Sequence, residues 1–207
     1  MKRINIRKFA SNIAISFFFT SIFVLIFYYI IDDKVSSYIS LINTVSIERK
    51  EIDVVATYDF NQKRLIDYPN FGSKYARLKI SSIDLDLPVY HGDTLKILRY
   101  GVGHYAGSYF PGENGTILMA AHNTSGFFKK LDKVNINDEI IIETDYGTFK
   151  YIVDKTDIVS EKDLDAFEIK HNGEKLILYT CYPINRSVVG RKTKRYLVYA
   201  SLEGKDE

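Results

Sequence analysis

The chain has 207 residues, of which 46% are hydrophobic and 26% are charged, and its formal net charge is +2. This composition predicts one folded domain with an appendage, and the near-neutral charge argues against a nucleic-acid-binding surface, which concentrates Lys and Arg. A single cysteine excludes an internal disulfide framework and a cysteine-based zinc site, and the four histidines do not have metal-ligand spacing. These counts therefore give metal binding little support, and we expect no nucleic-acid partner.

The first predicted element is an apolar helix near the N-terminus. Residues 13–31 contain no charged side chain, and a bilayer-spanning helix needs roughly 20 apolar residues. Four basic residues precede this run, so residues 1–12 are predicted to be a cytoplasmic tail and the rest of the chain to be extracellular. A cleaved signal peptide is the alternative, but Asp32–Val35 is a poor cleavage site. The sequence thus favours a single-pass anchor in the cell membrane.

The segment after the anchor, residues 32–72, is predicted to be a stalk or an N-terminal helical segment. Apolar residues fall near helical spacing over part of 35–67. The turn cluster Pro69–Ser73 is a plausible boundary. Residues 73–207 are therefore predicted to form the catalytic or binding domain.

This domain has an all-β pattern. Seven or more short strands with little helix between them are typical of a barrel or a sandwich. Short helical turns are expected within 95–100, 127–134 and 163–169, and residues 101–115 are expected to form a glycine-rich loop. The predicted strands are 76–80, 83–90, 116–121, 139–144, 147–154, 175–180 and 195–202.

Three residues at strand ends or starts carry chemistry: His122, Cys181 and Arg195. Taken singly, a cysteine is usually a small buried hydrophobe, and the histidine and arginine have equally ordinary structural explanations. Together they form a coherent set. A thiolate nucleophile is favoured by nearby cations, a histidine can protonate a departing amine, and an arginine can stabilise a developing oxyanion.

Two other arginines, Arg186 and Arg191, also follow the cysteine. Both lie in the polar stretch 185–194, which is predicted to be a loop. Arg195 opens the last strand, and a strand holds a side chain more rigidly than a loop does. We therefore favour Arg195, with Arg191 as the second choice.

Among the histidines, His122 is favoured because it directly follows a short apolar strand. His104 lies in the glycine-rich loop and is the alternative. His91 and His171 are close to Gly92 and Gly173, and we expect both to be exposed turn residues.

These residues also carry a resemblance. The sequence Leu-Tyr-Thr-Cys at 178–181, the arginine on the next strand, and the strand 117–122 ending in Ala-His resemble the sortase family. Sortases are membrane-anchored cysteine transpeptidases on the surface of Gram-positive bacteria. The resemblance covers about residues 76–201, including the glycine-rich stretch that leads to His122.

Within the family, the sequence is most similar to class D. Residues 180–183 and 194–198 carry this similarity, the N-terminal anchor fits it, and no Asp-Pro-aromatic lid motif precedes residue 76. There are two departures. Ala121 stands where the family often has glycine, and the segment 122–128 looks longer than is usual for class D.

The resemblance implies a closed or partly open β-barrel of about eight strands. It also implies that the chain cleaves a Leu-Pro-x-Thr-Gly-like sorting peptide between Thr and Gly through a cysteine thioester. The acyl group would pass to an amine of a cell-wall precursor or of a protein such as a pilin, without a cofactor. The implied catalytic residues are His122, Cys181 and Arg195, and the expected substrate-contacting residues are Ala121, Thr180 and Tyr182.

Calcium modulates some sortases through acids before the cysteine strand. Here Glu161, Asp163 and Asp165 occupy that region, and we expect them to be solvated acids rather than a metal site.

Two alternative functions remain at this point. One is a surface cysteine protease that hydrolyses its thioester, because only the acceptor differs from a transpeptidase. The other is a non-catalytic, membrane-tethered β domain for adhesion or ligand binding, in which Cys181 is buried and inert.

Overall fold

The computed structural model describes residues 15–27, 56–59, 61–184 and 192–204. Residues 15–27 form a helix. Within these ranges, no helix has both the length and the apolar character needed to cross a membrane. The predicted tail, and both ends of the predicted anchor at 13–14 and 28–31, lie outside the described residues.

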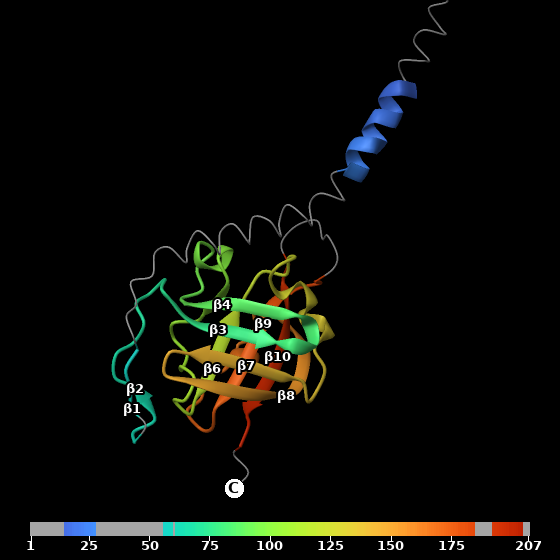
Figure 1. Ribbon diagram of the computed structural model, residues 1–207. Coiled ribbons are helices and arrows are strands. Elements are labelled where there is room, and N and C mark those ends of the chain that lie inside the picture. Colours follow the sequence, from blue (N-terminus) through green and yellow to red (C-terminus); the bar gives the residue numbers. More distant parts are fainter. Residues whose placement is uncertain (1–14, 28–55, 60, 185–191, 205–207) are drawn as a thin grey trace, which may run out of the picture.

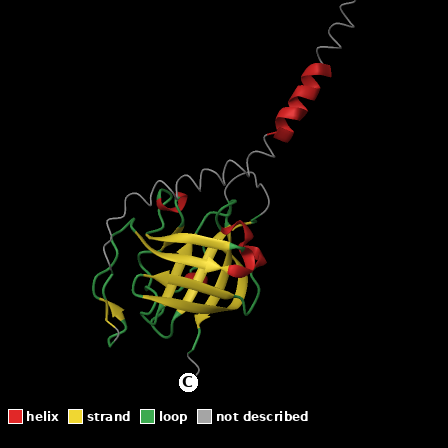
Figure 2. Ribbon diagram, viewed as in Figure 1, coloured by secondary structure: helices red, strands yellow, loops and turns green. Residues whose placement is uncertain are grey.

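Eight strands close into a barrel in the order β10-β8-β7-β3-β4-β5-β6-β9 (Figures 1 and 2). The prediction of an all-β barrel of about eight strands is confirmed. The pairs β4–β5 and β6–β9 are parallel, and the other pairs are antiparallel. The strands are β3 (Lys74–Ile80), β4 (Leu85–His91), β5 (Val102–His104), β6 (Thr116–Ala120), β7 (Glu139–Thr144), β8 (Gly147–Ser160), β9 (Lys175–Tyr182) and β10 (Lys194–Leu202).

Short 3₁₀ turns connect several of these strands. The three predicted helical turns correspond to η3, η4 and η5, and a further turn, η2, joins β3 to β4. Their bounds are η2 (Ser81–Ile83), η3 (Ile97–Arg99), η4 (Phe128–Lys133) and η5 (Asp165–Phe167).

Strand β5 was missed by the sequence analysis, which expected a loop over 101–115. Its three residues are too few to show a periodic pattern, and glycine is unfavourable in an isolated strand. Gly103 is needed here because a Cβ on it would lie 2.7 Å from the Gly92 carbonyl oxygen. Strand β8 was expected to end near residue 154, but its pairing with β10 extends it to Ser160.

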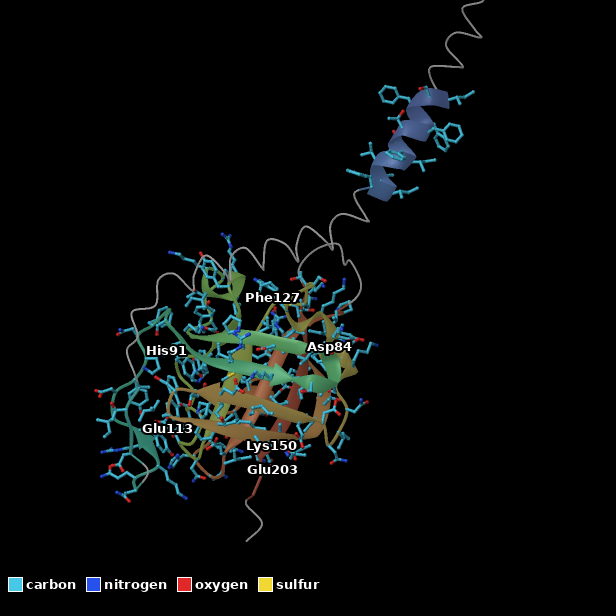
Figure 3. All side chains as sticks on the ribbon, viewed as in Figure 1. Asp84, His91, Glu113, Phe127, Lys150 and Glu203 are labelled. Carbon is cyan, nitrogen blue, oxygen red and sulfur yellow. The ribbon has the colours of Figure 1, made fainter. Side chains whose placement is uncertain are left out.

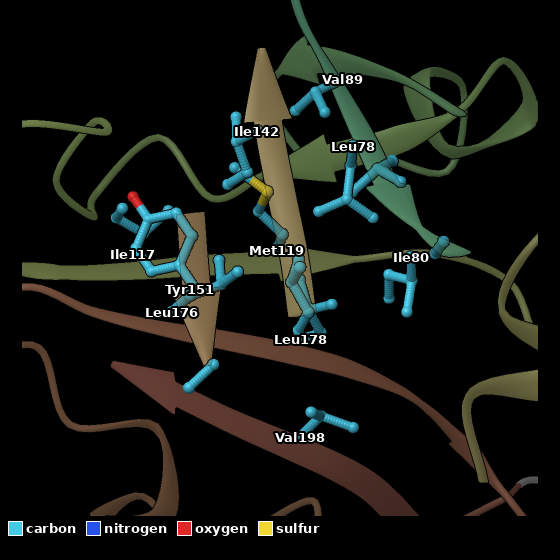
Figure 4. Packing of buried hydrophobic residues seen from close by; sticks show 14 of the residues in the cluster. Leu78, Ile80, Val89, Ile117, Met119, Ile142, Tyr151, Leu176, Leu178 and Val198 are labelled. Atoms are coloured by element: carbon cyan, nitrogen blue, oxygen red, sulfur yellow. The ribbon is translucent and has the colours of Figure 1, made fainter. Parts of the chain in front are cut away.

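The barrel interior is filled by the inward-facing side chains of its strands (Figure 4). On β9, Leu176 and Leu178 are fully buried and alternate with residues that face outward. A second, smaller cluster lies on the outer face, where Leu118, Ile177 and Leu197 pack together. Strand β9 is therefore covered on both faces, which explains its continuous apolar sequence.

The segment before the barrel is described from residue 56. Over 56–67, where a helix was expected, the structure has a two-stranded sheet of β1 (Tyr58–Asp59) and β2 (Arg64–Leu65). Leu65 joins the barrel core, and the Tyr58 hydroxyl donates to the Gly112 carbonyl at 2.7 Å. These tertiary contacts override the local helical spacing. We call residues 56–72 the strap, and the rest of the predicted stalk, up to residue 55, lies outside the described residues.

Candidate active site

The cysteine and the favoured arginine lie on neighbouring strands. Strands β9 and β10 are antiparallel, and their register sets Cys181 directly opposite Arg195. Residues directly opposite in an antiparallel pair project to the same face of the sheet. Both side chains are partly buried on the outer face of the barrel, where β9 approaches its end before Pro183. This strand pairing brings together two of the three predicted catalytic residues.

His122 reaches the same end of the barrel from β6. Strands β6 and β9 are parallel, with Ala120 level with Tyr179. His122 follows Ala120 by two residues, and Cys181 follows Tyr179 by two residues. The register of the two strands therefore carries the histidine to the level of the cysteine.

Asn123 fastens the His122 segment to the cysteine strand. Its side-chain amide donates to the Cys181 carbonyl at 2.9 Å and to the Pro183 carbonyl at 3.2 Å. On the other side, the Phe128 amide donates to the His122 carbonyl at 2.8 Å. His122 is thus held between the end of β9 and the start of η4.

The environment of His122 favours its neutral form. The imidazole is half-buried and lies edge-on to the Phe127 ring, with centroids 6.0 Å apart. Burial, and secondarily the charge of Arg99, hold the pKa of His122 below its usual value. A neutral imidazole can accept a proton from a neighbouring thiol.

The guanidinium of Arg195 is held by three acceptors. Its Nη2 donates to a Glu161 carboxylate oxygen at 2.7 Å, and its Nη1 donates to the carbonyls of Lys192 and Lys194 at 2.7 and 2.9 Å. Glu161 was considered above as a solvated acid, but its side chain is only 15% exposed. Among the described residues, no group of three or more side chains has the arrangement of a metal site.

The η5 turn, in the connection between β8 and β9, packs on the outer face of β9 two residues before the cysteine, and we call it the wall. Phe167, in η5, packs edge-on against Tyr179 with ring centroids 5.3 Å apart. Burial first, and the nearby carboxylate of Asp93 second, raise the pKa of Tyr179 to about 12. Tyr179 precedes Cys181 by two residues and so lies on the same face of β9. An aromatic surface therefore borders the thiol.

The three expected substrate-contacting residues have different surroundings. Thr180 is 2% exposed, and its hydroxyl donates to the Ala121 carbonyl at 2.8 Å. Ala121 is 5% exposed. These burials favour a structural role for both side chains, since Thr180 ties the end of β6 to β9. Tyr182 is partly exposed at the end of β9, and its contact with substrate stays a prediction.

His104, the alternative histidine, is fully buried in β5. Its Nε2 donates to the Tyr109 carbonyl at 3.0 Å, so its Nδ1 accepts from the Tyr75 hydroxyl at 3.0 Å. Burial lowers the pKa of His104 to about 3, with a smaller contribution from His91 and a small opposing one from Tyr109. A histidine that is neutral and fully hydrogen-bonded inside the core is structural.

The remaining candidates lie elsewhere. His91 is in β4 rather than in an exposed turn, and its Nδ1 lies 2.7 Å from the Pro69 carbonyl because the strap packs on it. His171 is exposed, as expected, and stacks on Tyr109 with centroids 5.0 Å apart. The alternative arginines 186 and 191 lie outside the described residues.

The sequence analysis missed Asn123 and Tyr179 as supporting residues. It considered Glu161 but missed its role in binding Arg195. Asn123 is adjacent to His122 and Tyr179 precedes Cys181 by two residues, so sequence proximity alone could have suggested them. Glu161 is 34 residues from Arg195 in the sequence, and only the β8–β10 pairing brings them together. The arrangement unites a thiol, a neutral imidazole and an oriented guanidinium.

Comparisons with known proteins agree with this geometry. A family model described as the Sortase domain matches residues 78–203. Sortase D of Bacillus subtilis (strain 168) is 37% identical over 131 residues, which are 63% of this chain and 65% of that protein. The match thus covers a little under two thirds of the relative's length. The expected likeness to class D is confirmed by this relative.

Solved structures give the same result. A Sortase D5 transpeptidase from Clostridium perfringens superposes with a TM-score of 0.61 at 25% identity, covering 81% of this chain and all of the other. Sortase C from Clostridium perfringens SM101 superposes with a TM-score of 0.57 at 28% identity, covering 65% of this chain and 72% of the other. The fold is therefore that of solved sortases, and the family-model match over most of the chain agrees. The chain is a member of the sortase family, whose enzymes are cysteine transpeptidases.

Proposed function

We propose that this chain is a transpeptidase that cuts a sorting peptide through a thioester on Cys181 and transfers the acyl group to an amine. The observation that carries this proposal is the register of β9 and β10, which sets Cys181 opposite Arg195. The parallel β6 strand supports it by bringing His122 to the same level. No other described residue has a thiol, so the nucleophile has one source.

The first half-reaction forms the thioester. The Cys181 thiol gives its proton to the neutral imidazole of His122, and the thiolate attacks the carbonyl carbon before the scissile bond. Arg195 stabilises the negative charge that develops on the carbonyl oxygen. His122 then passes its proton to the departing amine, the peptide bond breaks, and the acyl group stays on Cys181.

The second half-reaction resolves the thioester. An acceptor amine attacks the thioester carbonyl and loses its proton to His122. The Cys181 sulfur leaves as a thiolate, and a new amide is formed. The proton on His122 returns to the sulfur, so the enzyme ends as it began.

The proposed substrate is a peptide of the Leu-Pro-x-Thr-Gly type, cleaved between Thr and Gly. A Clostridium perfringens sortase C, a structural neighbour, was solved with the C-terminal cell wall sorting motif. In this chain, the outer face of β9 and the wall carrying Phe167 border Cys181 and would receive an extended peptide. The proposed acceptor is an amine of a cell-wall precursor or of a pilin-like protein.

We also propose that residues 13–31 anchor the chain in the cell membrane, with residues 1–12 in the cytoplasm and the barrel outside. The uncharged apolar run and the preceding basic residues support this topology. Fractionation of cells producing the full chain tests it. The chain should sediment with membranes and resist alkaline carbonate extraction, whereas a form lacking residues 1–31 should not. A full chain found in the soluble fraction would contradict the anchor.

The enzymatic proposal is tested with the full-length chain and fluorogenic peptides that vary the third position of Leu-Pro-x-Thr-Gly. Cleavage should occur, and triglycine should appear joined to the threonine carbonyl. Failure to cleave any variant while the circular dichroism of the barrel is intact would overturn the proposal. Cleavage that yields only the free acid, even with excess triglycine, would instead identify a hydrolase. Slow reaction of Cys181 with thiol reagents, together with no turnover, would favour the adhesion domain.

A further inference from the structure

The ion pair between Arg195 and Glu161 is the least exposed of the described ion pairs between side chains. The Nη2–Oε2 distance is 2.7 Å, and the two side chains are 18% and 15% exposed. Other described ion pairs, such as Lys170–Glu168, also reach 2.7 Å but are about half exposed. Exposed pairs contribute little, whereas a pair sheltered from water fixes the geometry of both partners.

Glu161 is itself held by the backbone. Its amide donates to the Thr193 carbonyl at 2.8 Å, which continues the β8–β10 ladder one step beyond the pairing of Ser160 with Lys194. The carboxylate is therefore presented by an extension of the sheet rather than by the polar loop that follows. It can hold the guanidinium in one place relative to β10.

The remaining hydrogens of Arg195 face no described acceptor. A guanidinium has five N–H hydrogens, of which Nη1 uses two on the Lys192 and Lys194 carbonyls and Nη2 uses one on Glu161. One Nη2 hydrogen and the Nε hydrogen are left. Since Arg195 stands opposite Cys181, these are the donors available to an oxygen on a substrate bound there.

We propose that Glu161 is a positioning residue that orients the Arg195 guanidinium toward the substrate oxygen at Cys181. This proposal rests on the transpeptidase function proposed above. An unrestrained arginine side chain populates many rotamers, and ordering it during the reaction costs free energy. A pre-formed ion pair removes that cost from the chemical step, so its loss lowers kcat more than it raises KM.

The main test compares Glu161→Ala with Glu168→Ala in the full-length chain, using a sorting peptide and triglycine. Both acids lie between β8 and β9, but Glu168 pairs with Lys170 instead of Arg195. Glu161→Ala should lower kcat about 10- to 100-fold, less than the loss of a whole oxyanion donor, with KM changed by less than about threefold. Glu168→Ala should leave both constants unchanged. A Glu161→Ala rate within about twofold of wild type would overturn the proposal.

A double-mutant cycle asks whether Glu161 acts through Arg195. In the Arg195→Ala background, adding Glu161→Ala should change kcat by less than about twofold, because the group it orients is already absent. Equal losses in both backgrounds would mean that Glu161 acts independently and would overturn the proposal. If Glu161→Ala does not fold, Glu161→Gln serves in its place, since it keeps an oxygen acceptor and the side-chain shape. Its kcat should fall less, by about three- to tenfold.

A measurement without turnover separates this proposal from the function on which it rests. Phenylglyoxal modifies accessible guanidinium groups, and peptide mass mapping locates the adduct. Arg195 should react several-fold faster in Glu161→Ala than in wild type or Glu168→Ala. Equal rates would overturn the positioning role. The wild-type chain could instead process no sorting peptide while Arg195 still reacts more slowly in it than in Glu161→Ala. That result would overturn the proposed function but not the contact that orients Arg195.

Discussion

The two ends of the β6–β9 strand pair differ in chemistry. At their starts, near Thr116 and Lys175, two buried carboxylates close the barrel. Glu174 accepts hydrogen bonds from the amides of Gly112 and Asn114 and from the Tyr151 hydroxyl. We call this region the closed end. Glu113, labelled in Figure 3, is the second carboxylate of the closed end. It accepts hydrogen bonds from the Leu65 amide and the Tyr68 hydroxyl of the strap.

The other end of the same two strands, which we call the reactive end, carries His122 and Cys181. Both side chains are partly exposed, and the oriented Arg195 completes the group from β10. The contrast indicates that one end of the strand pair supplies stability and the other supplies reactive groups. Substitutions at the two ends should therefore have separable effects on folding and on catalysis.

The largest expected effect is that of His122→Ala on catalysis. Loss of a positioned acid–base group should lower kcat/KM by about 10²- to 10⁴-fold. The free energy of unfolding should change by less than about 1 kcal/mol, since the imidazole is only half-buried. The matched control is His171→Ala, near the closed end, which should keep full activity. Equal losses of activity in the two variants would contradict the division between the ends.

Glu174→Ala should have the opposite pattern. Three donors lose their acceptor, and Glu174 is only 4% exposed, so the free energy of unfolding should fall by about 3 kcal/mol or more. Urea denaturation measures this loss. The exposed Glu139, which pairs with Lys150, is the control, and its alanine variant should change stability by about 0.5 kcal/mol or less. Activity per folded molecule should be retained in Glu174→Ala. A loss of that activity would contradict the division of roles between the closed end and the reactive end.

His104 predicts how stability depends on pH. Its pKa is about 3 in the folded chain and 6.5 when unperturbed, so below pH 6.5 the unfolded state binds a proton that the folded state does not. Stability is therefore present above pH 6.5 and is lost as pH falls toward 3. Between pH 7 and pH 5 this single group should remove about 2 kcal/mol.

Urea denaturation at the two pH values, compared between wild type and His104→Asn, measures that contribution. The variant is expected to be less stable at pH 7 and to have a flatter pH dependence. An equal pH dependence in both proteins would mean that His104 is not the titrating group.

The contrast between His122 and His104 also indicates what the sequence can predict. Strands β6, β9 and β10 were predicted because continuous apolar or alternating runs define them locally. His122, Cys181 and Arg195 were selected because they stand at the ends of such runs. By contrast, β5 is too short for a pattern, and the burial of His104 follows from its pairing with two neighbouring strands.

Other contacts depend on distant residues and have no local signal. The strap forms a strand pair because Leu65 enters the barrel core and its backbone amide donates to the Glu113 carboxylate of the closed end. The Glu161–Arg195 pair depends on the register of β8 and β10. In both cases residues far apart in the sequence determine the local structure.

The smallest expected effect is that of Asn123→Ala. Its amide holds the His122 segment to the Cys181 and Pro183 carbonyls, so its loss should loosen the histidine and lower kcat about tenfold. Asn135→Ala is the control, since its side chain bonds only locally to the Lys133 carbonyl and lies on the surface. Steady-state kinetics of both variants decide the point. Equal activities in Asn123→Ala and wild type would show that the fastening is not needed.

The central claim is that Cys181 becomes acylated by the threonine carbonyl of a sorting peptide. The direct measurement is intact-mass spectrometry of the full-length chain, quenched in acid after mixing with peptide in the absence of an amine. We expect a mass increase equal to the acyl fragment, located on the proteolytic peptide that contains Cys181. Hydroxylamine or triglycine should remove the adduct, and Cys181→Ala should not form it. Turnover of peptide with the adduct on another residue, or turnover that persists in Cys181→Ala, would contradict the account.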